Sequence, residues 1–449
     1  MSIYADDVVS FASLLKMAYN FLTGKEYLKR KKTREKKKLI SVALGFPDLV
    51  FAVGGVPVFP IRMETFKINT VLMALNSATS VLGWNLTTKV LDVARQFDFL
   101  KIVNGILDDV ITSVNKKYNL MYDLGVENGG PSDLCYGVNA LYGMHKSIGK
   151  NIDANLNFAM RCNEWNRYSE NLNSLVPNQV WVDIPSNKLN DEENTLEIMK
   201  NNINNAIREL ESITGNVVTE ESLKKQFRIG NQVKRFYKTI LYEISASDFY
   251  PCNPATFAEI LALLTISFQD YNSNAQRYLE NIGLLVKEMR ERIKNGIGME
   301  VSTMPRIILA PIFAGWEPEI HEIVYSLGGR IIYADWDILG MLEEIPVAKG
   351  SDPIEDYARF LLDASHKGIG CDGENLTKSY LNAAKNMEVD GFIFNQVFGC
   401  PSISSLYTNL QQKIKNELDI PSAVISFRKI GANIDEVRNQ IESFMKKFE

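Results

Sequence analysis

The last third of the chain has the clearest pattern, because short apolar runs alternate there with amphipathic segments. The apolar runs predict strands over 306–313, 329–337, 390–400 and 422–427. The segments between and after them predict helices over 317–327, 357–366, 376–386, 405–418 and 436–448. Strands that alternate with helices are typical of a parallel α/β sheet, in which ligands bind beyond the carboxyl ends of the strands.

The middle of the chain, from 191 to 296, is almost entirely helical in pattern. Thr219 is the predicted N-cap of one of these helices, because two glutamates and an amphipathic run follow it. The sequence PCNPATF, at 251–257, interrupts the helical region. We therefore expect a helical insert between two α/β units.

The first third mixes helical and extended patterns. Residues 8–38 are helical in pattern, an apolar run from Phe46 ends at two glycines, and 66–122 is again helical. Ser132 or Asp133 is predicted to cap a helix that starts near Cys135, and QVWVDIP (179–185) predicts a strand. The expected fold is α/β, with two Rossmann-like parallel-sheet domains facing a cleft. The predicted divisions are an N-terminal helical segment (1–40), a first α/β domain (41–188), a helical insert or linker (189–300) and a second α/β domain (301–449).

Composition narrows the classes of protein that fit. The chain has 449 residues, 46% of them apolar and 23% charged, and a net charge of −5, so a nucleic-acid partner is not expected. The N-terminus lacks the pattern of a targeting signal, and the longest apolar runs are far short of a membrane span of about 20 residues. We expect a cytoplasmic, reducing location, where thiols bind metal or do chemistry more often than they form disulfides.

Several common catalytic motifs are missing from the sequence. It has three histidines and contains neither HExxH nor GxSxG. It also lacks GxxxxGK[ST], so we do not expect this chain to hydrolyse ATP through a P-loop.

The cysteines are the leading candidates for chemistry, and three of the five stand at turns or strand ends. Cys135 follows a Gly-Pro turn at a predicted helix start, where helix amides favour a thiolate. Cys162 precedes a polar segment, and Cys400 ends a predicted strand between Gly399 and Pro401. Three thiolates can hold an iron–sulfur cube with one iron left open for a substrate oxygen.

Other interpretations of the thiols stay open. A single buried cysteine is often only a small core residue, and no CxxC pair occurs. Cys371, among glycines, is a fourth candidate ligand, whereas Cys252, between two prolines, suggests a structural role. A zinc site would need a fourth ligand, for which Asp133 and Glu164 are near in sequence.

A dense basic segment runs from Lys25 to Lys38, with nine basic and two acidic residues. It includes Lys29 and Arg30. Charge runs are most often solvated helix faces. The functional alternatives are a surface that meets the phosphates of coenzyme A and a docking face for an acidic partner protein.

Several blocks resemble one family when they are taken in order. FPDLVFAVGGVPVFPIRM (46–63) is similar to a helix that ends at Ala-x-Gly before a Val-Pro strand, and CNEWNRYSENL with VWVDIP (162–185) is similar to a second-cysteine block. TGNVVTEESLKKQFRIGNQVKRFYK (214–238), with its central Asn231, resembles a helical insert. GWEPEIHEIVYSLGGRIIYADWD (315–337) resembles a strand–helix–strand unit, and VDGFIFNQVFGC (389–400) resembles a third-cysteine block. Together they resemble the 2-hydroxyacyl-CoA dehydratase and benzoyl-CoA reductase subunit family.

The resemblance implies a mechanism and a set of ligands. In this family two α/β domains surround a cleft in which three cysteines hold a [4Fe–4S] cluster, so Cys135, Cys162 and Cys400 are the expected ligands. The resemblance also implies a heterodimer with a second family subunit and a separate ATP-hydrolysing iron–sulfur activator that injects one electron. A ketyl radical at the thioester of an acyl-CoA then expels a leaving group that acid–base chemistry cannot, and the cofactor carries this step.

The sequence also departs from the family. Phe427-Arg428 stands where members commonly have an acidic residue, and NLTKSYLNAAK (375–385) replaces a helix that usually contains arginine. The leading hypothesis is an iron–sulfur subunit of an ATP-activated radical (R)-2-hydroxyacyl-CoA dehydratase, a carbon–oxygen lyase. The alternatives are a benzoyl-CoA reductase-type subunit, a non-catalytic electron-transfer companion subunit and a zinc-binding α/β protein.

Overall fold

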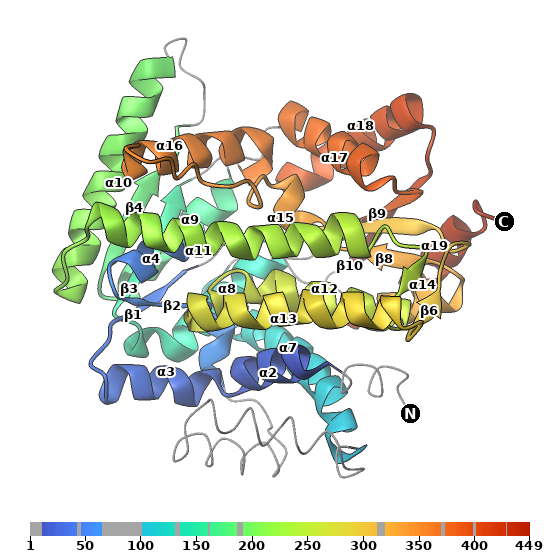
Figure 1. Cartoon of the computed structure of the whole chain (residues 1–449), viewed down its shortest axis with the longest axis horizontal. Helices are drawn as coiled ribbons and strands as arrows, with labels where there is room; N and C mark the ends of the chain where they lie inside the picture. The colour runs from blue at the N-terminus through green and yellow to red at the C-terminus, as the bar shows by residue number, and fades with distance from the viewer. Residues whose placement is uncertain are drawn as a thin grey trace.

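A computed structural model describes residues 11–42, 46–64, 101–130, 135–159, 162–185, 192–311, 319–369, 373–397, 401–427 and 429–449. These residues form two four-stranded sheets and one two-stranded sheet, and long helices extend between the two larger sheets (Figure 1). Every strand pair in the two larger sheets is parallel. The predicted α/β class with two Rossmann-like parallel sheets is therefore confirmed.

The first sheet has the strand order β2-β1-β3-β4. Its strands are β2 (Val56–Val58), β1 (Leu39–Ser41), β3 (Ala154–Ala159) and β4 (Gln179–Asp183). The chain passes from β1 outward to β2 on one side of the sheet, and from β3 outward to β4 on the other side. The direction of winding therefore reverses between the neighbouring strands β1 and β3. Ligands bind beyond the carboxyl ends of the strands at such a reversal.

The sequence pattern did not reveal β1 or β3. β1 has three residues and directly follows the basic segment, so it offers too short an apolar run. β3 contains two buried asparagines, and the Asn157 Nδ2 donates to Gln179 Oε1 of β4 at 2.8 Å. Because a side-chain hydrogen bond satisfies the polar group inside the sheet, the strand does not read as apolar.

The second sheet has the order β10-β9-β7-β8. Its first strand also lies beside its third, so the chain winds as it does in the first sheet. Its strands are β8 (Arg330–Ile332), β7 (Arg306–Ala310), β9 (Gly391–Val397) and β10 (Ser422–Phe427). The strand predicted over 329–337 ends early, because the chain turns into the short helix α15 (Asp335–Ile338). Trp336 of α15 is buried, and its indole N–H donates to the Thr265 carbonyl at 2.9 Å.

The first half of the chain supplies the helices α2 (Ala12–Leu22), α3 (Gly24–Thr33), α4 (Asp48–Ala52), α7 (Lys101–Glu127), α8 (Tyr136–Ile148), α9 (Asn163–Asn171), α10 (Glu192–Thr214) and α11 (Glu220–Thr239). The second half supplies α12 (Pro254–Ser267), α13 (Ala275–Lys294), α14 (Ile320–Ser326), α16 (Pro353–Ala364), α17 (Gly373–Met387), α18 (Pro401–Leu418) and α19 (Ile434–Met445). Shorter pieces are η1 (Pro60–Met63), η3 (Gly149–Asn151), η4 (Leu172–Ser174), η6 (Tyr271–Ser273), the π-helical turns η5 (Ile240–Ile244) and η7 (Ser365–Ile369), and the antiparallel pair β5 (Phe249–Tyr250) and β6 (Met299–Glu300).

Helix boundaries confirm one predicted cap and correct another. Thr219 caps α11 as predicted, in a reciprocal box with Ser222. The prediction that Ser132 or Asp133 caps the helix near Cys135 is wrong, because the N-cap of this helix is Cys135 itself. The helix predicted over 8–38 is interrupted at Thr23, whose side chain bonds back to the Tyr19 carbonyl, and gives way to β1 at Leu39.

The long helices α11 and α13 pack against each other and run from the first sheet toward the second (Figure 1). One apolar cluster includes Ile40 of β1, Val233 of α11, Ile282 of α13 and Phe392 of β9. Burial of this shared apolar surface stabilises both sheets together. The division at residues 40, 188 and 300 stays a prediction.

A buried ion pair joins the first sheet to the start of α13. Arg62, in η1 after β2, lies 2.7 Å from Asp270, and both side chains are almost fully buried. The same carboxylate accepts the backbone N–H groups of Phe59 and Asn272 at 3.0 and 2.9 Å. Arg62 also donates to Ser273 Oγ. Removing one partner of such a pair leaves an uncompensated buried charge, at a cost of about 3–5 kcal/mol.

Two glycines let α7 and α8 approach until their backbones touch. A Cβ atom on Gly143 of α8 would lie 1.8 Å from the Met121 carbonyl oxygen of α7. A Cβ on Gly125 of α7 would lie 2.1 Å from the Asn139 carbonyl oxygen of α8. Neither distance is compatible with a side chain, so this helix pair requires glycine at both positions.

We predict that Gly143→Ala forces α8 away from α7 and lowers the free energy of unfolding by at least about 1–3 kcal/mol. Urea unfolding followed by circular dichroism measures this loss. Ser147→Ala, on the exposed side of α8, is the control and should change stability by less than about 0.5 kcal/mol. Equal midpoints for both variants would contradict the close contact.

Candidate metal centre

Two of the predicted ligands occupy equivalent positions, each at the start of its own helix. Cys135 is the N-cap of α8 and Cys162 is the N-cap of α9. Cys135 is buried and Cys162 is half-buried. The first N–H groups of a helix lack intrahelical partners and carry a partial positive charge. These N–H groups can stabilise negative charge on a sulfur ligand placed at either position.

The two sheets present cysteines at equivalent points. β3 ends at Ala159, and Cys162 follows three residues later, directly before α9. β9 ends at Val397, and Cys400 follows three residues later, directly before α18 at Pro401. Cys371 and Cys400 themselves lie outside the described residues, so their roles stay predictions.

The carboxyl end of β10 meets the helices that carry the first cysteines. The ring of Phe427, the last residue of β10, lies 6.0 Å from that of Tyr136, the residue after Cys135. The Asn119 amide of α7 donates to the Ile430 carbonyl at 2.9 Å. In the sheet register Phe427 pairs with Val397 of β9. The strand that leads to Cys400 thus ends beside the strand that contacts the Cys135 helix.

Aromatic side chains surround the described thiols. Cys135 and Cys162 belong to an apolar cluster with Tyr118, Trp165 and Tyr168. Burial, and secondarily the nearby Cys135, raises the pKa of Tyr118 above its usual value. Burial likewise raises the pKa of Tyr168. Both phenols therefore keep their protons and can act as hydrogen-bond donors beside the cysteines.

A buried histidine connects β1 to both cysteine-bearing helices. His145 of α8 contacts Ser41 Oγ, at the end of β1, through Nε2 at 2.9 Å. Its Nδ1 lies 3.0 Å from the Leu141 carbonyl and 2.9 Å from the Tyr168 hydroxyl of α9. Because a carbonyl can only accept, Nδ1 carries the proton, Nε2 accepts, and Ser41 donates. Burial lowers the pKa of His145 to about 4, so the ring is neutral and a poor base.

Sequence reasoning missed this group of residues. Ser41 and Tyr168 carry no motif, and His145 lies about a hundred residues from Ser41 along the chain. Glu64, which follows η1 near the carboxyl ends of the first sheet, is a buried acid that the sequence did not single out either. Its Oε2 lies 3.5 Å from the Lys117 ammonium. Only the parallel winding of the sheet brings such distant residues to one edge.

The zinc interpretation stays a prediction. Glu164 has a carboxylate oxygen 3.9 Å from the Arg167 guanidinium, and Asp133 lies outside the described residues. Across the described ranges, no three His, Cys, Asp or Glu side chains group as a metal site. Cys252 is fully buried in the main apolar cluster, in keeping with a structural role.

The basic segment lies at the opposite end of the first sheet from the cysteines. Lys32 binds Asp153, just before β3, at 3.2 Å, and residues 34–38 lead into the amino end of β1. Lys31 pairs with Glu35, and Arg30 lies over the Tyr27 ring at 5.7 Å. Lys29 is exposed, as are the basic residues Arg34, Lys36, Lys37 and Lys38.

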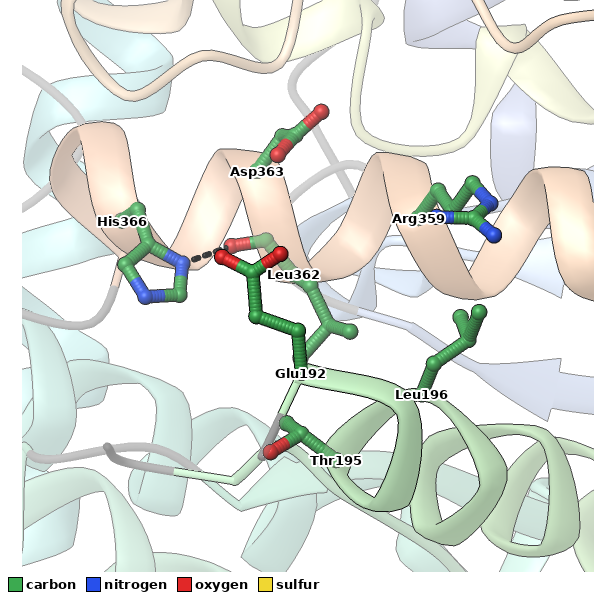
Figure 2. Close-up of a pocket in the computed structure, with 7 residues that line it drawn as sticks. All are labelled: Glu192, Thr195, Leu196, Arg359, Leu362, Asp363 and His366. Carbon is green, nitrogen blue, oxygen red and sulfur yellow. Dashed lines mark hydrogen bonds between the residues drawn. The ribbon is translucent and has the colours of Figure 1, made fainter. Parts of the chain in front are cut away.

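A separate pocket of about 150 Å³ lies between the start of α10 and the end of α16. Figure 2 shows Glu192 reaching from α10 toward α16 beside His366, whose Nδ1 lies 2.6 Å from the Leu362 carbonyl. The other lining residues are Thr195, Leu196, Arg359 and Asp363. None of the described residues that line this pocket is a cysteine, so it does not coincide with Cys135 or Cys162.

The fold and these contacts define a two-sheet α/β protein with thiols at the carboxyl edges of its parallel strands. The family model described as 2-hydroxyglutaryl-CoA dehydratase, D-component, matches residues 110–447. The chain belongs to this family, as the resemblance predicted. A search of curated proteins gave no match.

Membership of the family settles the broad activity. The chain is a subunit of a 2-hydroxyacyl-CoA dehydratase-type enzyme and therefore of a lyase-type enzyme. The D-component name implies a partner component and an activator. Among the described helices, none is both long and apolar enough to cross a membrane.

We predict that acid weakens the fold through His145. The unfolded chain takes up this proton below a pH of about 6.5, whereas the native ring resists it down to a pKa of about 4. Stability should therefore fall as the pH drops from about 6.5 toward 4, by roughly 2 kcal/mol between pH 7.5 and pH 5. His145→Gln removes this dependence, and urea unfolding at the two pH values measures the difference from wild type. His366→Gln is the control, and a wild-type acid slope in His145→Gln would refute the assignment.

Proposed function

We propose that this chain is an iron–sulfur subunit of an ATP-activated radical (R)-2-hydroxyacyl-CoA dehydratase. Cys135, Cys162 and Cys400 would hold a [4Fe–4S] cluster. The observation that carries the proposal has two parts: Cys162 and Cys400 each follow the third strand of a parallel sheet by three residues in the sequence, and β10, the neighbour of β9, ends against the Cys135 helix.

The residues around the described thiols fit such a group. Cys135 and Cys162 sit at helix N-termini, where N–H groups stabilise the negative charge that a thiolate-bound cluster carries. The Trp165 indole N–H, in the same apolar cluster as both thiols, is buried with no hydrogen-bond partner within the described chain. The sulfur atoms of a cluster are hydrogen-bond acceptors that could supply the missing partner.

When bound, the cluster would supply low-potential one-electron chemistry to the thioester, which loses its hydroxyl group and a hydrogen as water. The residues of this chain hold and shield that site. His145 fixes α8 and α9 to the end of β1, and the Tyr118 phenol stays protonated beside Cys135. The aromatic and apolar side chains around Cys135 would limit the access of water to such a centre, which would protect reactive species from side reactions.

We predict that the cluster depends on three specific thiols. Cys135→Ser, Cys162→Ser and Cys400→Ser should each lose most of the iron and sulfide after anaerobic reconstitution of the full chain. Cys252→Ser, at a fully buried thiol outside the site, is the matched control and should retain them. Iron and acid-labile sulfide analysis, with absorption spectra, measures the outcome. A colourless wild-type protein that binds stoichiometric zinc would refute the proposal.

Activity assays with the partner component and the activator separate the remaining functions. Water elimination from a 2-hydroxyacyl-CoA that depends on ATP and on Cys162 supports the dehydratase. Reduction of an aromatic acyl-CoA would instead indicate the benzoyl-CoA reductase type. Thioester binding by the partner alone would make this chain an electron-transfer companion.

We further propose that the basic segment meets an acidic protein surface rather than coenzyme A phosphates. It lies at the amino end of β1, whereas a thioester at the cysteines would lie at the carboxyl end. Lys29 and Lys37 are exposed. Charge attraction between proteins speeds their association and weakens with salt.

We predict that Lys29→Glu with Lys37→Glu slows association with a partner protein about tenfold or more at low salt, measured by stopped-flow fluorescence. The difference should shrink at high salt. The control reverses Lys413 and Lys446, two exposed lysines of the second half. If neither pair of charge reversals changes the association rate, the docking proposal is wrong and the segment is only a solvated helix face.

A further inference from the structure

Within the described part of the chain, the Trp165 indole is a buried hydrogen-bond donor without an acceptor. Trp165 is 7% exposed, and its Nε1 atom is buried with no hydrogen-bond partner in the described part of the chain. Indole N–H groups usually find an acceptor when they are buried. Leaving such a donor unsatisfied costs about 1–3 kcal/mol, so its presence calls for an explanation.

The position of Trp165 on α9 brings it close to Cys162. Cys162 is the N-cap of the helix, and Trp165 is the third residue of its first turn. The N-cap and the third helical residue are neighbours on the first turn of a helix, three positions apart. Trp165, Cys135 and Cys162 share one apolar cluster. The unpaired donor therefore lies next to the proposed ligands.

The other buried tryptophan with a described partner shows the usual arrangement. Trp336 is 1% exposed, and its N–H donates to the Thr265 carbonyl at 2.9 Å. The two residues are thus similar in size and burial but differ in whether the protein supplies an acceptor. Tyr168, whose ring centroid lies 5.2 Å from that of Trp165, is engaged with His145.

We propose that the Trp165 N–H donates to a sulfur atom at the metal centre, either the Cys162 thiolate or an inorganic sulfide. This inference rests on the proposed function. Hydrogen bonds to the sulfurs of a cluster withdraw negative charge and so favour the reduced state. Trp165 is then a positioning and tuning residue, which sets how readily the centre accepts an electron.

The test replaces each tryptophan by phenylalanine, which keeps an aromatic ring and removes the N–H. Full-length wild type, Trp165→Phe and Trp336→Phe are reconstituted anaerobically with iron and sulfide. Their midpoint potentials are measured by redox titration with electron paramagnetic resonance. We expect Trp165→Phe to bind wild-type iron and to show a tenfold lower ratio of reduced to oxidised centre at a fixed potential, about 59 mV for one electron. Trp336→Phe should keep the wild-type potential.

A second measurement uses the same proteins without metal. Thermal unfolding of the metal-free chain should be harmed less by Trp165→Phe than by Trp336→Phe, because only the latter breaks a hydrogen bond within the protein. Equal losses would show that the Trp165 N–H has an acceptor in the chain itself and would overturn the inference.

The outcomes separate this inference from the proposed function. Iron in the wild type with an unchanged potential in Trp165→Phe would overturn the donor role alone. A wild type that takes up neither iron nor sulfide would overturn both. A potential shift confined to Trp165→Phe, with iron retained, would support the assignment, since a packing role alone would not move the potential.

Discussion

The buried Arg62–Asp270 ion pair is the interaction on which the arrangement of the first half depends. Arg62 joins the end of β2 to the turn before α13, and Gly24 at the start of α3 packs against its backbone. Two desolvated charges are stable only where further hydrogen bonds satisfy them, and Asp270 accepts two backbone N–H groups as well. The pair therefore fixes the turn before α13 to the end of β2, and α13 contributes to the apolar cluster that both larger sheets share.

The repeated winding gives Cys162 and Cys400 equivalent places in the order of elements along the chain. Both sheets place their first strand beside the third, and the chain reverses its direction of winding between them. Loops at the carboxyl ends of these strands lie at one edge of each sheet. Cys162 follows the third strand of the first sheet, and Cys400 follows the third strand of the second. Cys135 joins Cys162 through α8, which packs against α9 and is held to α7 by two glycines.

The sequence predicted the fold class because the second half alternates apolar runs and helices with little ambiguity, and because Thr219 has a strong cap pattern. It failed at β1 and β3, where a short strand and buried asparagines hide the apolar signal. It also extended a strand through Asp335, where burial of Trp336 turns the chain into a helix. The cysteines could be singled out from their neighbours, but Ser41, His145 and Trp165 could not, since their roles depend on contacts across elements.

The proposed metal centre would also act on the fold itself. Its thiols come from both halves of the chain, so binding would cross-link the edges of the two sheets. Within the described residues, the contacts across these edges include the Tyr136–Phe427 ring pair and the Lys429–Asp123 ion pair at 2.6 Å. The ion pair is over one-third exposed on both sides, and such pairs contribute about 0–1 kcal/mol. The buried Phe427 and Ile430 side chains and the Asn119–Ile430 hydrogen bond also cross this junction, so a metal centre held by three thiolates would add a cross-link to an edge that the protein already packs together.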